Sequence, residues 1–300
     1  MKIENLGILK GTKTTVKSGQ ITYLPEFETV KEGDTKNPKP ISADIKADKE
    51  FYQGELKFKF KTQKPDAGVI LVFEDGDSHI STVGLSRVAD AFVIVDKLSN
   101  VNIKAGNIKN YELNSEILIK VDWNGSKMKL YVNNVILCET NSFSLRYLPI
   151  HFRITSSGEV KVYDIELNSL KPKLFVVMQF TDDYNKLYSE VIHPVAEKMG
   201  FECIRADEHY SSTPILKDII TSIEESSAII ADITPDNPNV FYEIGYSHAI
   251  NKPTILLCDK KREKLPFDIS GFRTLFYENT IAGKSQIEKN LSKYLLNLKS

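Results

Sequence analysis

The stretch AIIADITPDNPNVFYEIGYSHAINKPTILLC, residues 228–258, decides the fold of the second half of this 300-residue chain. It begins with a predicted strand, AIIAD (228–232), and ends with another, PTILLC (253–258), and both are mostly apolar, as expected for parallel strands that are buried on both faces. Between them, a loop of Pro, Asp and Asn leads into a helical segment, with Asn237 as the cap and Pro238 as the first helical residue. Strand, helix and strand at this spacing predict a parallel sheet covered by helices.

The same alternation continues on both sides of this stretch. Pro194 lies inside a helical stripe and should kink the helix or end it early. Thr213 and Pro214 are the expected cap and first residue of another helix. We therefore predict a doubly wound, mainly parallel five-stranded sheet of the flavodoxin or Rossmann kind. The remaining strands are expected at 174–180, 201–207 and 273–277, and the remaining helices at 184–199, from 213 onward and around 287–298.

Before about residue 170 the pattern is different, because apolar and polar residues alternate with period two and no helical stripe is present. Asn124-Gly125 is the strongest of several turn signals between these runs. The sequence predicts an all-β antiparallel sandwich over 1–168, a linker at 169–173 and an α/β domain over 174–300. Whether residues 1–45 close the sandwich or wrap the second domain is left open. The predicted strands are 54–62, 68–75, 91–97, 116–123, 127–134, 150–157 and 159–167.

The composition is that of an ordinary soluble globular protein, with 41% hydrophobic and 26% charged residues. A net charge of −1 gives no electrostatic reason to expect nucleic acid or an anionic membrane as a partner. The sequence shows neither a signal peptide nor a run long enough to span a membrane. Cys138, Cys203 and Cys258 are isolated in apolar stretches, which indicates buried free thiols and a reducing cytoplasm. We expect a homo-oligomer, since symmetric assemblies are common.

A candidate site is expected outside the carboxyl ends of the parallel strands, where open sheets of this kind bind ligands. Asp259 directly follows the strand at 253–258, and Glu243 lies in the second turn of an otherwise apolar helix. The amides that begin this helix favour an anion such as phosphate. The candidates for substrate binding are Gln179, Phe180, Thr181, Asp207, Asp232, Thr234, Asp236, Asn237, Asn239 and Gly245, and no metal site is expected.

Glu243 is the catalytic candidate. A carboxylate beside a sugar's anomeric carbon stabilises or traps the oxocarbenium-like state through which reactions at that carbon pass. The simpler interpretation is that a helix glutamate is solvated and that Asp232 only caps the following turn. The apolar neighbours Val240, Phe241 and Ile244 favour the functional interpretation, because they require burial around Glu243.

The string Asp-x-Thr…Asn-Pro-Asn-Val-Phe-Tyr-Glu-x-Gly, residues 232–245, resembles the nucleoside 2-deoxyribosyltransferase-like group and the related bacterial Toll/interleukin-1-receptor-like domains. The resemblance covers about 174–278. It implies an N-glycosidic-bond hydrolase or transferase that acts on NAD or a related nucleotide, with Glu243 as nucleophile and no permanently bound cofactor. By analogy it also implies a regulated bacterial defence effector. The transferases carry an aspartate six residues before the glutamate, where this chain has Asn237.

The sequence also allows two alternative functions. One is a non-catalytic nucleotide-binding sensor whose β-sandwich binds a protein partner. The other is a glycan-binding protein, because residues 45–168 resemble concanavalin-like or laminin-G-like jelly rolls. Asp75, Asp77 and His79 are conceivable calcium ligands there, although a solvated turn is the favoured interpretation. Trp123 is expected in the core rather than on a sugar-binding surface.

Overall fold

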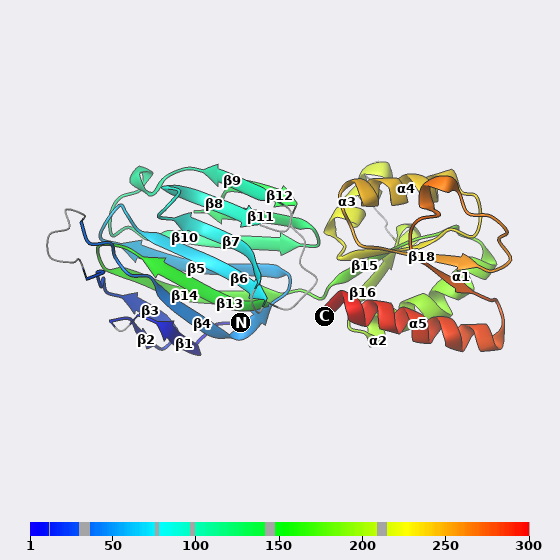
Figure 1. The fold of residues 1–300 in the computed structure, drawn as a ribbon, viewed down its shortest axis with the longest axis horizontal. Coiled ribbons are helices and arrows are strands. Elements are labelled where there is room, and N and C mark those ends of the chain that lie inside the picture. Colours follow the sequence, from blue (N-terminus) through cyan, green and yellow to red (C-terminus); the bar gives the residue numbers. More distant parts are fainter. Residues whose placement is uncertain are drawn as a thin grey trace. The chain divides into compact units, whose positions relative to one another are not determined.

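The computed structural model describes residues 1–11, 13–29, 37–75, 78–96, 100–141, 148–208 and 215–299. The chain forms two compact units, one built from residues 1–123, 127–142 and 147–170 and the other mainly from 171–300. The first is an antiparallel β-sandwich, and the second is a parallel five-stranded sheet with helices (Figure 1). The fold class predicted from the sequence is confirmed at this level.

The sandwich consists of two seven-stranded sheets whose strands pair in the antiparallel sense. One sheet has the order β1 (Leu6–Lys10), β4 (Ala43–Phe51), β13 (Leu148–Thr155), β6 (Gly68–Asp75), β7 (Ser78–Ser86), β8 (Ala91–Asp96) and β9 (Val101–Ala105). The other has the order β12 (Val135–Asn141), β11 (Lys127–Val132), β10 (Ile117–Asn124), β5 (Gly54–Thr62), β14 (Val160–Ser169), β3 (Gln20–Tyr23) and β2 (Thr15–Lys17). A short 3₁₀ turn, η1 (Ile108–Asn110), follows β9. Because β1, β2 and β3 belong to these sheets, the open question about the first 45 residues is answered in favour of the sandwich.

Alternate side chains of each strand fill the space between the two sheets. In β5, every second residue is buried, which places one face of the strand in the core. Trp123 is 1% exposed, and its ring lies 5.6 Å from that of Phe73 and 6.2 Å from that of Phe51. Trp123 is therefore a core residue, as predicted.

The second unit is a parallel sheet with strand order β16-β15-β17-β18-β19. Its strands are β15 (Lys173–Val177), β16 (Glu202–Arg205), β17 (Ala228–Asp232), β18 (Thr254–Asp259) and β19 (Thr274–Tyr277). Its helices are α1 (Asp182–Leu187), the π-helix η2 (Tyr188–Ile192), α2 (His193–Lys198), α3 (Ile215–Glu225), α4 (Pro238–Ala249) and α5 (Ile281–Lys299). Two 3₁₀ turns, η3 (Ala206–Glu208) and η4 (Phe267–Ile269), complete it.

The helices cover both faces of this sheet (Figure 1). On one face, Leu174 and Val176 of β15 pack in a cluster with α1, η2, α2 and α5. On the other face, Phe175 and Val177 of the same strand pack in a cluster with α3 and α4. Because the strands are apolar on both sides, each face needs its own layer of helices.

Pro194 changes the hydrogen-bonding pattern of the helical segment 182–198. It has no N–H, so it makes no bond to the carbonyl of Glu190 one turn earlier. The chain widens into the π-helix η2, in which the N–H of His193 bonds to the carbonyl of Tyr188, five residues before it. The predicted kink or early break is therefore a π turn.

Some predictions fall on residues that are not described. Thr213, Pro214 and Asp77 lie outside the described residues, as do the side chains of Asp75 and His79. The three cysteines are buried and free. Within the described parts of the chain, no helix has both the length and the apolar character needed to cross a bilayer.

Candidate functional site

Two cavities lie at the carboxyl edge of the parallel sheet, one on each face. The larger, which we call the Glu243 cavity, has a volume of about 650 Å³ and is formed by the ends of β15 and β16 together with α3 and the start of α4. Cavities of this size hold small-molecule ligands. It is lined by Val176, Val177, Met178, Gln179, Phe180, Ala206, Asp207, Leu216, Asp218, Ile219, Asn237, Asn239, Val240, Tyr242 and Glu243.

Glu243 is the most unusual ionisable residue of this cavity. It is 8% exposed, and its carboxyl group has no hydrogen-bond or ion-pair partner among the described residues. Burial alone raises the pKa of Glu243 to about 7, because charging the carboxyl would cost solvation that nothing nearby replaces. Near neutral pH the group can therefore both donate and accept a proton or a hydrogen bond.

The start of α4 offers little to an anion. Asn237 caps the helix, and its side-chain oxygen already accepts the N–H of Asn239 at 3.0 Å. Pro238 has no N–H, and the N–H of Phe241 bonds to the carbonyl of Asn237. Of the first four helical positions, at most the amide of Val240 is left for a ligand.

Asp207 is held at the rim of the cavity by an arginine from the preceding strand. The guanidinium of Arg205 donates from Nε to Oδ1 of Asp207 at 2.7 Å and from NH2 to Oδ2 at 2.6 Å. It also donates to Asn185 and lies 4.4 Å from the centre of the Tyr188 ring. This bidentate ion pair fixes the carboxylate of Asp207 and neutralises its charge.

The structure separates the residues that the sequence predicted as one site. The Glu243 cavity brings together Gln179, Phe180, Asp207, Asn237, Asn239 and Glu243.

The other predicted residues lie elsewhere. Thr181 is exposed at the N-terminus of α1. Gly245 is exposed, with open space where a side chain would stand. Asp236 forms an ion pair with Arg262, away from the Glu243 cavity.

Asp232 belongs to a buried hydrogen-bond network below the sheet's carboxyl edge. It accepts the hydroxyl of Tyr277 at 2.9 Å and the N–H of Thr234 at 2.9 Å. Burial raises the pKa of Asp232 to about 6, against the opposing effect of these hydrogen bonds. The Thr234 hydroxyl lies 3.2 Å from that of Tyr277, so the three side chains form one chain of polar groups.

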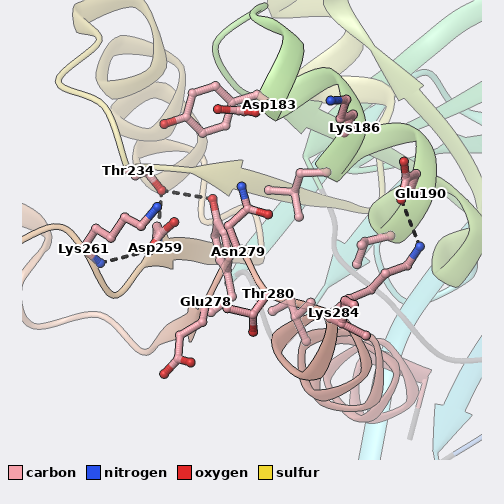
Figure 2. A pocket seen from close by; sticks show the side chains of 16 residues that line it. Asp183, Lys186, Glu190, Thr234, Asp259, Lys261, Glu278, Asn279, Thr280 and Lys284 are labelled. Atoms are coloured by element: carbon pink, nitrogen blue, oxygen red, sulfur yellow. Dashed lines mark hydrogen bonds and ion pairs between the residues drawn. The ribbon is translucent and has the colours of Figure 1, made fainter.

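The second cavity, which we call the Asp259 cavity, has a volume of about 410 Å³ and lies on the other face of the sheet (Figure 2). It is enclosed by α1, η2, the start of α5 and the ends of β17, β18 and β19. The sequence marks Asp259 only as a strand-end residue and does not reveal the cavity, because its lining comes from four separate segments, 183–191, 234, 259–261 and 277–287. The lining residues are Asp183, Tyr184, Lys186, Leu187, Glu190, Val191, Thr234, Asp259, Lys261, Tyr277, Glu278, Asn279, Thr280, Ile281, Lys284 and Ile287.

Comparison with known proteins finds solved structures that are similar to about half of this chain at low sequence identity. No family model matches the chain, and no curated protein matches it. A Bacillus licheniformis beta-glucanase is 10% identical, with a TM-score of 0.39, over 54% of this chain and 90% of its own. The carbohydrate-binding module CBM66 from Bacillus subtilis is 8% identical (TM-score 0.34, 54% and 94%), and the laminarinase from Flavobacterium sp. UMI-01 is 14% identical (TM-score 0.35, 54% and 94%).

These comparisons correct the family assignment made from the sequence. They bring out β-sandwich glucanases and a carbohydrate-binding module, with no nucleoside transferase or Toll/interleukin-1-receptor-like protein among them. The predicted membership of those groups is wrong, and so are the predicted N-glycosidase activity on NAD or a nucleotide, the defence role, the nucleotide-sensor alternative and the nucleotide partner.

The Glu243 cavity supplies a physical reason for this correction. Phosphate groups need cationic side chains or free helix amides. None of the described residues that line this cavity is Lys or Arg. Most of the amides at the start of α4 are already bonded or missing, as shown above. The cavity therefore offers few groups that could bind the phosphates of a nucleotide.

Proposed function

We propose that the second unit binds a small uncharged carbohydrate in the Glu243 cavity. The observation that carries this proposal is Glu243 itself, a buried carboxyl group without a partner, in a cavity of about 650 Å³ without a cationic side chain among its described lining residues. A ligand with hydroxyl groups can supply the missing hydrogen bonds of Glu243 in either protonation state, because a hydroxyl both donates to a carboxylate and accepts from a carboxylic acid.

The rest of the lining supports a neutral, hydroxyl-rich ligand. Gln179 and Asn239 add amide donors and acceptors, and the fixed carboxylate of Asp207 adds acceptors. Phe180 and Tyr242 line the cavity and are 50% and 53% exposed. Such rings offer flat apolar surfaces on which the C–H face of a sugar ring packs, while its hydroxyl edge reaches the polar groups.

The charge of the lining excludes the anionic relatives of such a ligand. Asp207, Asp218 and Glu243 all carry carboxyl groups, and Asp207 forms an ion pair with Arg205. A phosphorylated sugar would place two negative charges beside them. The proposal therefore predicts that a neutral sugar binds more tightly than its phosphate ester.

The test is a calorimetric titration of the full chain with a panel of neutral mono- and disaccharides, with glucose 6-phosphate beside glucose. Glu243→Leu keeps the volume but removes both oxygens, so we expect affinity to fall at least about tenfold. Glu197→Gln, which changes an exposed glutamate of α2, is the matched control and should bind as the wild type does. Binding of no neutral sugar, or tighter binding of the phosphate ester, would refute the proposal.

A further inference from the structure

The Asp259 cavity contains a carboxylate that is only half satisfied. Asp259 is 8% exposed. Its Oδ1 accepts the backbone N–H of Lys261 at 2.9 Å, and its Oδ2 has no hydrogen-bond or ion-pair partner among the described residues. Buried carboxylates are normally paired or fully hydrogen-bonded, so this oxygen, which lines a cavity, calls for a donor from outside the chain.

The hydroxyl protons of Thr234 and Tyr277, two residues that line the cavity, are directed elsewhere. The Tyr277 hydroxyl donates to Asp232, because a carboxylate accepts. The oxygen of Thr234 accepts the backbone N–H of Asp259 at 2.9 Å, which leaves its proton free to point at Tyr277. The chain of donors therefore runs from Thr234 through Tyr277 to Asp232, away from the second oxygen of Asp259.

Three lysines line the cavity, Lys186, Lys261 and Lys284, and none of them forms an ion pair with Asp259 in the described structure. Figure 2 shows Asp259 beside Thr234 and the Lys284–Glu190 ion pair in another part of the cavity. In that pair, Lys284 lies 3.0 Å from Glu190. Lys261 contacts Asp259 through its backbone N–H, and its side chain makes no ion pair with it in the described structure. Among the residues that the structure describes, this buried carboxylate therefore has no counter-ion.

One part of the cavity wall is apolar, and the rest of the lining carries charged and polar side chains. Leu187 and Val191 project from α1 and η2, and Ile281 and Ile287 from α5. This lining suits an aliphatic body, and the volume of about 410 Å³ limits that body to a small molecule.

We propose that the Asp259 cavity is a binding site for a primary ammonium group carried on a short aliphatic chain, with Asp259 as its counter-ion. An ammonium brings three N–H donors and one positive charge, which match the open oxygen and the buried charge. The aliphatic chain then covers the leucine, valine and isoleucine side chains. This site is distinct from the Glu243 cavity, with which it shares no lining residue.

The test is a titration of the full wild-type chain with three probes of equal chain length: 1-pentylamine, 1-pentanol and pentyltrimethylammonium. The amine should bind at least about tenfold more tightly than the alcohol, which lacks the charge, and than the trimethylated ion, which lacks the N–H donors. Equal binding of the three probes, or no saturable binding of the amine, would overturn the proposal. This comparison needs no variant, so a folding defect does not affect it.

A pair of variants then locates the site. Asp259→Asn removes the buried charge, and we expect amine affinity to fall at least about tenfold. Asp183→Asn removes an exposed carboxylate that lines the same cavity, and its effect should stay below about threefold because water screens it. The helix circular-dichroism signal shows whether each variant is folded. A larger loss from Asp183→Asn than from a folded Asp259→Asn would contradict the assignment of Asp259.

Discussion

Replacing Glu243 by Gln keeps the shape of the side chain and removes its charge, so it isolates the cost of a carboxylate in the Glu243 cavity. Burial raises the pKa of Glu243 from 4.5 to about 7. A group whose pKa is higher in the folded protein contributes stability below its unfolded pKa, and loses that contribution as the pH rises through the folded pKa. Between about pH 4.5 and pH 7, the wild type should therefore lose stability relative to Glu243→Gln.

The size of this loss follows from the same pKa values. A rise from 4.5 to about 7 corresponds to about 3 kcal/mol of unfolding free energy. Part of the Glu243 side chain reaches solvent, which lowers the cost of its charge. We therefore expect the difference between variant and wild type to change by about 2 kcal/mol between about pH 5 and about pH 8, in favour of the variant.

The two units can be followed separately in one denaturant titration. All the α-helices described lie within residues 182–299, so the far-ultraviolet helix signal reports the second unit. Trp123 is the only tryptophan of the chain and is buried in the sandwich, so its fluorescence reports the first unit. A separate signal for each unit is needed because a two-domain chain need not unfold in one step.

Glu197→Gln is the control, since it removes a glutamate that is exposed on α2. Its pH profile should follow the wild type, and the tryptophan transition should be the same in all three proteins. If Glu243→Gln also followed the wild type at both pH values, the carboxyl of Glu243 would be charged at no extra cost in the folded protein. The argument from burial, and with it the basis of the proposed binding site, would then be refuted.

Three further substitutions test the structure. Arg205→Lys replaces the two-pronged bond to Asp207 by a single ammonium and should destabilise the second unit by about 1–3 kcal/mol, read from the helix signal. Phe152→Ala empties a fully buried site and should destabilise the first unit by about 3–5 kcal/mol, read from tryptophan fluorescence, with the helix transition unchanged. Tyr277→Phe removes a hydrogen-bond donor to Asp232, whose pKa burial raises to about 6. The charged carboxylate of Asp232 depends on that donor more than the neutral acid does. The loss of stability should therefore be about 1–2 kcal/mol larger at about pH 8 than at about pH 5.

Where the information is local, the sequence predicts the elements closely. The strands expected at 54–62 and 68–75 are β5 and β6 with the same bounds. Each combines strict alternation or a continuous apolar run with turn residues at both ends. The cap of α4 is equally local, because Asn237 and Pro238 carry the whole signal within two positions.

Where strands depend on distant partners, the sequence is less informative. β3 is four residues long and pairs with β14, in a register that joins Tyr23 to Val160. Nothing within so short a segment distinguishes it from a loop, since it is held between β2, just before it in the chain, and β14, more than a hundred positions away. β1 likewise depends on a partner from outside its own segment, since it pairs with β4 through Leu6 and Ala47.

In the candidate sites too, features set by nearby residues could be predicted, and features set by distant residues could not. The burial of Glu243 could be predicted, because its apolar neighbours on α4 require it. The roles of Arg205 and Asp259 could not be predicted. Arg205 depends on Asn185 of α1, and Asp259 depends on which hydroxyl protons are already used by Asp232 and its partners. Whether a polar atom is satisfied is a property of the whole packed structure.

The two cavities make the two binding proposals independent of each other. They lie on opposite faces of one sheet and have no lining residue in common. Their charge requirements also differ, since the described lining of the Glu243 cavity holds no lysine or arginine and Glu243 is neutral below about pH 7, whereas the proposed ligand of Asp259 is positively charged. A sugar and an amine should therefore stabilise the second unit additively when both are bound. Mutual exclusion would mean that both probes occupy one cavity, and Asp259→Asn would then weaken both.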